Sequence, residues 1–184
     1  FFMNLTLDSL KKDELVSLQL RKLYEQYGYK KYQVRKFEEY ELYLENKNFL
    51  STEKVITFND LDGKLLALKP DVTLSIAKNT NASTTQNEKL YYIENVYRLS
   101  KQTHEYTEIN QMGLELLGNI DGFATAEVVS LALQSLDAID RSFVLDISHM
   151  GFVSGLLESF SIDWPLQQKL LSCIRSKNLH DLRS

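Results

Sequence analysis

The sequence contains a single cysteine, no long apolar run and no excess of positive charge. One thiol forms no disulfide within the chain, which fits a reducing compartment. No apolar run approaches the roughly 20 residues that a membrane-spanning helix needs. Lysine and arginine number 21 against 25 acidic residues, a net charge of −4, and no basic stripe of the kind that nucleic-acid-binding proteins carry is visible. We therefore expect neither a membrane protein nor a nucleic-acid partner.

The start of the chain lacks a basic region followed by a long apolar region, so it does not resemble a signal peptide. The cytoplasm is therefore the expected location. Cys173 lies in the apolar stretch LLSCI, a setting typical of a small buried hydrophobe rather than of a catalytic or metal-binding thiol. The length of 184 residues suffices for one domain with a sizeable core.

The most informative stretch, residues 89–118, consists of two extended segments joined by a polar connection. Segment 90–99 is rich in Tyr, Ile, Val and Leu, and segment 106–117 alternates more loosely. β-Branched and aromatic side chains fit a pleated, half-buried surface, and a polar break between two such segments is typical of a hairpin. The stretch therefore predicts a two-stranded hairpin.

Polar side chains stand among hairpin residues that should be buried. Alternate residues of a strand point to the same face, so one row is shared by Ile109, Gln111, Gly113 and Glu115. A row with an amide, a glycine and a carboxylate makes a poor hydrophobic face. We expect it to form the floor of a polar ligand site.

Apolar periodicity, turn residues and the two prolines place the remaining elements. The expected helices cover residues 8–27, 71–79, 123–139, 152–160 and 165–174. The expected further strands cover residues 54–58, 64–68 and 142–147, and a further element is expected to begin at 178. Segment 38–50 suits either helix or strand. We assign His149, in an expected turn, a structural role. This order predicts one α+β domain over residues 1–184, with helices grouped around a mostly antiparallel sheet.

Three segments resemble the class II aminoacyl-tRNA synthetases, specifically their histidyl branch. LLALKPDVTLSIAK, at 65–78, is similar to that branch's leucine, arginine-proline-acid, x, threonine element. NVYRLS followed by EINQMGLELLG is similar to its motif 2, a strand with an arginine, a loop and a glutamine-x-glycine-x-glutamate strand. LDISHMG, at 145–151, is more similar to a synthetase-like paralogue, the ATP phosphoribosyltransferase regulatory subunits. The resemblance implies an antiparallel class II sheet flanked by helices, cut short at the C-terminal end of this sequence.

The resemblance also implies a pocket for histidine. Its members in this sequence are Asp71, Thr73, Arg98, Gln111 and Glu115. In the family, the acid at Asp71 holds the α-amino group, the arginine at Arg98 faces the carboxylate, and the acid at Glu115 meets the imidazole. The set is chemically sensible, because charge-assisted hydrogen bonds to an ammonium, a carboxylate and a polar side chain orient a free amino acid.

Two structural roles remain open beside the ligand roles. Arg98 can pair on its strand with Glu94 or Glu108. Asp71 and Thr73 also suit a helix N-terminus, where an aspartate caps exposed N–H groups. The capping and ligand roles of Asp71 are compatible with each other.

The sequence departs from the synthetase pattern where ATP would bind. Class II enzymes have a glutamate two residues after the motif 2 arginine, and this sequence has Ser100. The loop places Glu105 and Thr107 where histidyl enzymes have arginines, and an acid there repels a triphosphate. Lys69 replaces the arginine before the proline and lacks its bidentate fork. Within this sequence, the motif 3 arginine and a later tyrosine motif have no counterpart. We assign no catalytic residue, cofactor or metal.

The resemblance implies a non-catalytic regulatory subunit of ATP phosphoribosyltransferase. Its partner would be the short-form catalytic subunit, which joins ATP and phosphoribosyl pyrophosphate in the first step of histidine biosynthesis. L-Histidine would be the effector, which requires unequal binding to two states of the assembly. We expect a homodimer within a hetero-oligomer. Two alternatives stay open: a histidyl-tRNA synthetase catalytic-domain fragment, and a stand-alone amino-acid-binding sensor.

Overall fold

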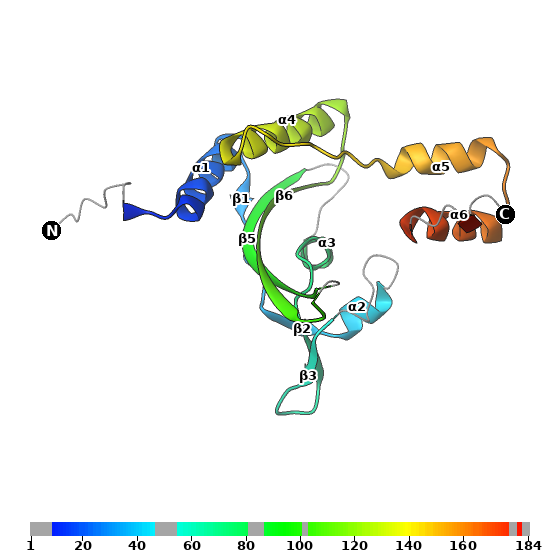
Figure 1. Ribbon diagram of the computed structural model, residues 1–184, viewed down its shortest axis with the longest axis horizontal. Helices are drawn as coiled ribbons and strands as arrows, with labels where there is room; N and C mark the ends of the chain where they lie inside the picture. Colours follow the sequence, from blue (N-terminus) through cyan, green and yellow to red (C-terminus); the bar gives the residue numbers. More distant parts are fainter. Residues whose placement is uncertain (1–8, 47–54, 81–86, 101–102, 177–179, 182–184) are drawn as a thin grey trace. The chain divides into compact units, whose positions relative to one another are not determined.

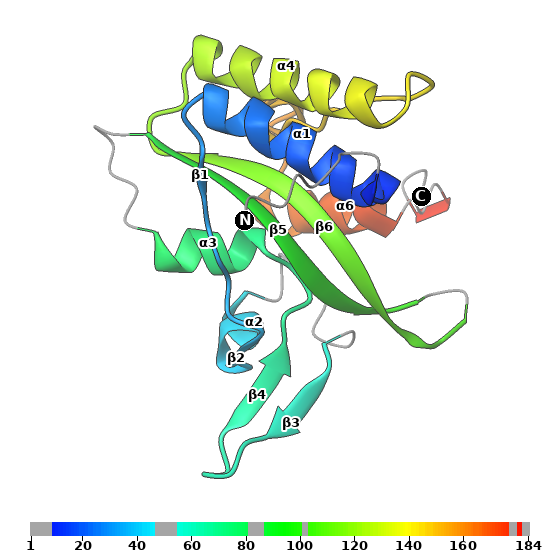
Figure 2. The ribbon, with the colours of Figure 1, turned by 90° about the vertical axis from the view of Figure 1, so that its left-hand side faces the viewer.

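The computed structural model describes residues 9–46, 55–80, 87–100, 103–176 and 180–181 (Figures 1 and 2). The chain divides into two compact units, Phe1–Phe143 and Val144–Ser184. Each unit is described by itself below. The expectation of one domain over the whole chain stays a prediction.

The first unit is built on the predicted hairpin. β5 (Glu88–Leu99) and β6 (Tyr106–Leu117) pair in antiparallel register along their whole length, and they form the long curved ribbon at the centre of Figure 1. The short strand β1 (Lys30–Lys31) pairs in parallel with the other side of β5. The hairpin prediction is therefore confirmed, with the two strands at the positions that the sequence indicated.

Two helices cover one face of this sheet, α1 (Lys12–Gln26) and α4 (Gly122–Ile139), which lie side by side in Figure 2. The Tyr24 and Ser135 hydroxyls, one from each helix, lie 2.9 Å apart in the interior. The core between helices and sheet contains buried Leu20, Tyr24, Tyr29, Tyr91 and Leu131. Both helices were predicted from their apolar periodicity, and α1 begins four residues later than expected.

The opposite face of the hairpin packs against α3 (Thr73–Asn79). Val72 and Ile76, on or beside this helix, are buried against Tyr92 and Val96 of β5. Since side chains of a strand alternate between faces, the Tyr92 side of β5 is distinct from the Tyr91 side, which the long helices cover. The polar row of β6 lies on the α3 side.

A second sheet is formed by β2 (Phe37–Glu39), β4 (Leu65–Leu68) and β3 (Thr57–Asn59). The expectation of a single sheet was therefore wrong, because β4 pairs on both sides with short strands and not with the hairpin. The β3–β4 turn has Gly63 at a φ of +82°, as its tight geometry requires. The ambiguous segment 38–50 contains the end of β2 and the helix α2 (Glu41–Glu45); residues 47–54 lie outside the described ones.

A buried ion pair joins the end of β4 to the hairpin. The Lys69 ammonium donates to Glu94 Oε2 at 2.6 Å, and the two side chains are 1% and 17% exposed. The other oxygen of Glu94 accepts from the Val34 backbone N–H at 3.3 Å. The carbonyl of Lys69 accepts from the Tyr97 N–H at 3.0 Å. This pair therefore fixes the chain where it leaves the small sheet for α3.

The second unit contains α5 (Met150–Ser159) and α6 (Trp164–Ser176), close to their predicted positions. His149 Nδ1 accepts from the Phe152 N–H at 3.1 Å, a helix-capping contact that agrees with its expected structural role. The strand predicted at 142–147 is wrong, because these residues have no strand conformation and pair with none of the described strands, and β-propensity alone does not make a strand. Cys173 is buried, as expected. Of the element expected from 178, only residues 180–181 are described.

The described helices include none that is long and apolar enough to cross a membrane.

We expect Lys69→Met to lower the free energy of unfolding by about 3 kcal/mol, because the variant leaves the largely buried Glu94 carboxylate without its cation. Urea or thermal unfolding measures this change. Lys64→Met is the matched control, because Lys64 Nζ lies 3.8 Å from Glu39 and these side chains are 67% and 64% exposed. Its loss should stay below about 1 kcal/mol. Equal losses in both variants would contradict the central role of the Lys69 pair.

Candidate functional site

The polar row of β6 faces α3, and Thr73 of that helix contacts Glu115 of the row. Gln111, Gly113 and Glu115 alternate along the strand and therefore share one face. In the register of the hairpin, Gly113 lies opposite Tyr92. The predicted floor of polar groups is thus present, and its centre is the tyrosine on the neighbouring strand.

Tyr92 approaches Gly113 so closely that no other residue fits there without a shift. A Cβ added at Gly113 would lie 2.5 Å from the Tyr92 hydroxyl oxygen. The Gln111 side-chain amide donates to that oxygen at 3.0 Å, and Tyr92 is only 3% exposed. Tyr92 was not among the residues predicted for the site. The signal that was available is its place opposite the glycine in a hairpin of equal strands.

Thr73 connects α3 to the polar row. Its hydroxyl donates to Glu115 Oε1 at 2.6 Å. Thr73 is the first residue of α3, and Glu115 lies near the end of β6. The structure therefore brings together two residues that the resemblance had assigned to the same pocket.

Asp71 and Arg98 form the other side of the site. Arg98 Nη2 lies 3.5 Å from Asp71 Oδ2, and Arg98 Nε donates to the Pro70 carbonyl at 2.8 Å. Asp71 Oδ1 also accepts from the Leu74 N–H at 3.2 Å, so the capping role coexists with the ion pair.

The partners considered for Arg98 on its own hairpin are engaged elsewhere. Glu94 bonds to Lys69, and Glu108 accepts from Asn95 and Tyr97. Arg98 therefore faces Asp71 and not the acids of the hairpin.

The electrostatics of the site follow from its burial. Burial is the main cause that raises the pKa of the Glu115 carboxyl, with Asp71 adding to it and the hydrogen bond from Thr73 opposing it. Burial, helped by the charges of Glu115 and Asp71, raises the pKa of Tyr92 to about 12. Two carboxylates and one guanidinium leave an excess of negative charge. Such a site favours a ligand that carries cationic or hydrogen-bond-donating groups.

The outer end of the hairpin differs in chemistry from this site. Ser100 N–H donates to the Glu105 carbonyl at 2.8 Å, and His104, at a φ of 55°, closes the turn. Residues 101–102 lie outside the described ones. Lys101 is one of these two residues, and the described part of the turn carries the acid Glu105. Lys69, which stands where the family has an arginine, is buried against Glu94 and does not reach this end.

Over the described residues, no group of three His, Cys, Asp or Glu side chains is arranged to hold a metal ion.

The chain matches the family model described as histidyl-tRNA synthetase over residues 2–184. It is 30% identical over 180 residues to a histidine–tRNA ligase of Methanocaldococcus jannaschii, an alignment that covers 96% of this chain and 43% of the relative. It is 29% identical over 180 residues to an ATP phosphoribosyltransferase regulatory subunit of Oceanobacillus iheyensis, covering 96% of this chain and 44% of that protein. The chain thus spans less than half of these relatives.

Solved structures share the fold. An ATP phosphoribosyltransferase regulatory subunit/histidyl-tRNA synthetase from Bacillus halodurans superposes with a TM-score of 0.73 at 23% identity, covering 96% of this chain and 47% of that one. The ATP phosphoribosyl transferase complex from Thermotoga maritima gives 0.63 at 21% identity, covering 98% and 60%. The expected class II synthetase-like α+β architecture is therefore confirmed. With a family model matched over nearly its whole length, the chain belongs to the histidyl-tRNA synthetase family.

Proposed function

We propose that this chain is part of a non-catalytic regulatory subunit of ATP phosphoribosyltransferase. One observation carries the proposal: Asp71, Thr73, Gln111 and Glu115 lie around Tyr92, and Arg98 joins them through its contact with Asp71. The similarity to the Oceanobacillus iheyensis regulatory subunit supports it.

The amino-acid site suits L-histidine. Asp71 would accept from the α-ammonium, Arg98 would donate to the α-carboxylate, and Glu115 would accept from the imidazole N–H. Arg98 is already oriented by the Pro70 carbonyl, and Glu115 by Thr73. Because these side chains are held before a ligand arrives, binding costs little ordering of the site.

The turn at the hairpin end argues against amino-acid adenylation. That reaction depends on cations and positioning at the phosphates of ATP. Ser100 replaces the glutamate expected for ATP binding, and Glu105 stands in a position where histidyl enzymes have arginine. A carboxylate beside the triphosphate of ATP repels it and so weakens the binding of ATP.

In the proposed assembly, catalysis belongs to the short-form catalytic subunit. This chain would activate that subunit and respond to histidine. For feedback inhibition, histidine must bind the inhibited state of the assembly more tightly than the active state, and the difference in affinity limits the size of the effect.

A second candidate function has its own support. The Methanocaldococcus jannaschii relative is a histidine–tRNA ligase, so this chain can also be part of a synthetase that activates histidine. In that case histidine and ATP would both bind.

Calorimetric titration tests the amino-acid site. We expect L-histidine to bind wild-type chain and the Glu115→Gln variant to bind at least about tenfold more weakly, because it loses a charge-assisted hydrogen bond. ATP should give no heat of binding. Glu105→Gln, at the exposed turn, is the control and should bind histidine like the wild type. Unchanged histidine affinity in Glu115→Gln would contradict the assignment, and ATP binding would favour the synthetase.

The raised pKa of Glu115 predicts a pH-dependent stability. A carboxyl whose folded pKa exceeds its ordinary value of 4.5 stabilises the fold below that value, and this contribution is lost as the pH rises through the folded pKa. The side chain in Glu115→Gln does not ionise, so this variant does not lose that stability as the pH rises. Thermal unfolding between about pH 4 and about pH 8 should therefore show the variant gaining on wild type as the pH rises. A difference that is constant with pH would contradict a raised pKa.

The partnership is tested by mixing this chain with a short-form ATP phosphoribosyltransferase catalytic subunit. We expect the two to elute together in size-exclusion chromatography, and the catalytic rate to rise on addition of this chain. Histidine-dependent exchange of pyrophosphate into ATP by this chain alone would instead establish the synthetase alternative.

A further inference from the structure

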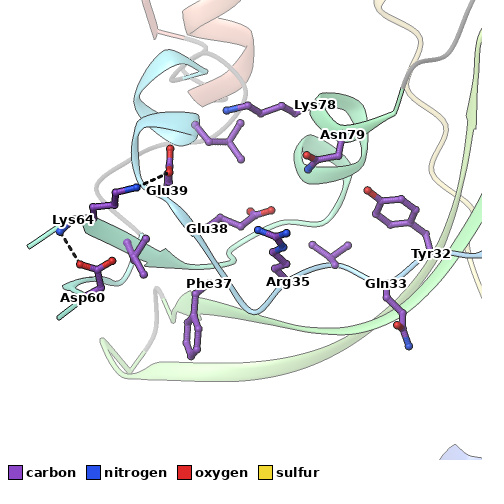
Figure 3. A pocket seen from close by; sticks show the side chains of 13 residues that line it. Tyr32, Gln33, Arg35, Phe37, Glu38, Glu39, Asp60, Lys64, Lys78 and Asn79 are labelled. Atoms are coloured by element: carbon purple, nitrogen blue, oxygen red, sulfur yellow. Dashed lines mark hydrogen bonds and ion pairs between the residues drawn. The ribbon is translucent and has the colours of Figure 1, made fainter. Parts of the chain in front are cut away.

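A cavity of about 590 Å3 lies beside the small sheet, and none of the five amino-acid-site residues lines it. It is bounded by the segment between β1 and β2, by the β3–β4 hairpin and by the end of α3. Figure 3 shows Arg35, Glu38, Lys78 and Asn79 around it. The cavity therefore belongs to a different part of the first unit.

Two of the three acids that line the cavity are engaged by the protein itself. Glu39 lies 3.8 Å from the Lys64 ammonium. Asp60 Oδ1 accepts from the backbone N–H groups of Asp62 and Lys64, at 2.9 and 2.8 Å. These two carboxylates already have contacts within the small sheet and its turn, so a ligand would not need to satisfy them.

The third acid, Glu38, accepts hydrogen bonds from two buried hydroxyl groups. Its Oε2 accepts from Ser75 Oγ at 2.7 Å and from the Tyr43 hydroxyl, and Tyr43 and Ser75 are both fully buried. Its Oε1 makes no hydrogen bond within the described residues. Glu38 is therefore a fixed acceptor with one oxygen left for a ligand.

The cations of the cavity include two without a protein partner. Arg35 and Lys78 are exposed, and over the described part of the chain they make no hydrogen bond or ion pair. Asn79 uses its side-chain N–H on the Ser75 carbonyl at 2.8 Å, which leaves its side-chain oxygen as a second acceptor. The cavity thus offers two cations and two oxygen acceptors.

We propose that this cavity binds a small organic phosphate that carries hydroxyl groups. The phosphate would accept charge-assisted hydrogen bonds from Arg35 and Lys78, and the hydroxyls would donate to Glu38 Oε1 and the Asn79 oxygen. Arg35 and Lys78, which form no ion pair within the described residues, favour a ligand with an anionic group that both can contact. The proposal shares no residue with the amino-acid site and stands independently of the proposed function.

Titration calorimetry of the full chain with ribose 5-phosphate tests the proposal. We expect saturable binding, weakened about tenfold by Arg35→Gln and again by Lys78→Gln, since each variant removes a charge-assisted contact. Lys22→Gln, on the exposed side of α1, is the matched control for loss of one positive charge and should bind like wild type. Circular dichroism confirms that the variants are folded.

Three results would overturn the proposal. These are absence of saturable binding to wild type, an affinity that neither Arg35→Gln nor Lys78→Gln changes, and inorganic phosphate or aspartate binding as tightly as ribose 5-phosphate. Histidine titrated into the same two variants separates the two sites, because its affinity should equal that of wild type if the amino-acid site is intact.

Discussion

The register of the β5–β6 hairpin is the constraint on which the first unit depends. Because side chains alternate along a strand, a slip of one residue would send Tyr91 toward α3 and Tyr92 into the layer of the long helices. The close approach of Tyr92 to Gly113 makes such a slip costly. With the register fixed, the same two strands supply an apolar face for α1 and α4 and a polar face for a ligand.

Much of this arrangement was predictable because its causes are local. The hairpin, the two long helices and the polar row follow from periodicity, and the family resemblance assigned Thr73 and Glu115 to one pocket, where the structure shows that they pair. The strand predicted at 142–147 failed for a different reason. A strand needs a partner that satisfies its backbone N–H and C=O groups, and residue propensities do not identify that partner. The same limit explains the pairing of β2 with β4, which are distant in sequence, whereas β3 and β4 are joined by a tight turn.

Lys69 illustrates how a resemblance can be correct while the role read from it is not. At the level of sequence, a lysine in place of an arginine suggests weaker recognition of a phosphate. In the fold, the side chain is buried and its charge is balanced by Glu94. Distinguishing the two roles requires knowing which carboxylate lies within reach, and Glu94 is 25 residues away along the chain. Lys69 therefore helps to fix the course of the backbone that leads to Asp71, and this role involves no contact with a ligand.

The shortness of α3 has a mechanical consequence. Its seven residues span about 10 Å at the rise of an α-helix. Thr73 at one end touches the amino-acid site, and Lys78 near the other end lines the cavity. If this short helix shifts as one body when a ligand binds at one end, its other end is displaced as well. Linkage then requires the effect of each ligand on the binding of the other to have the same size.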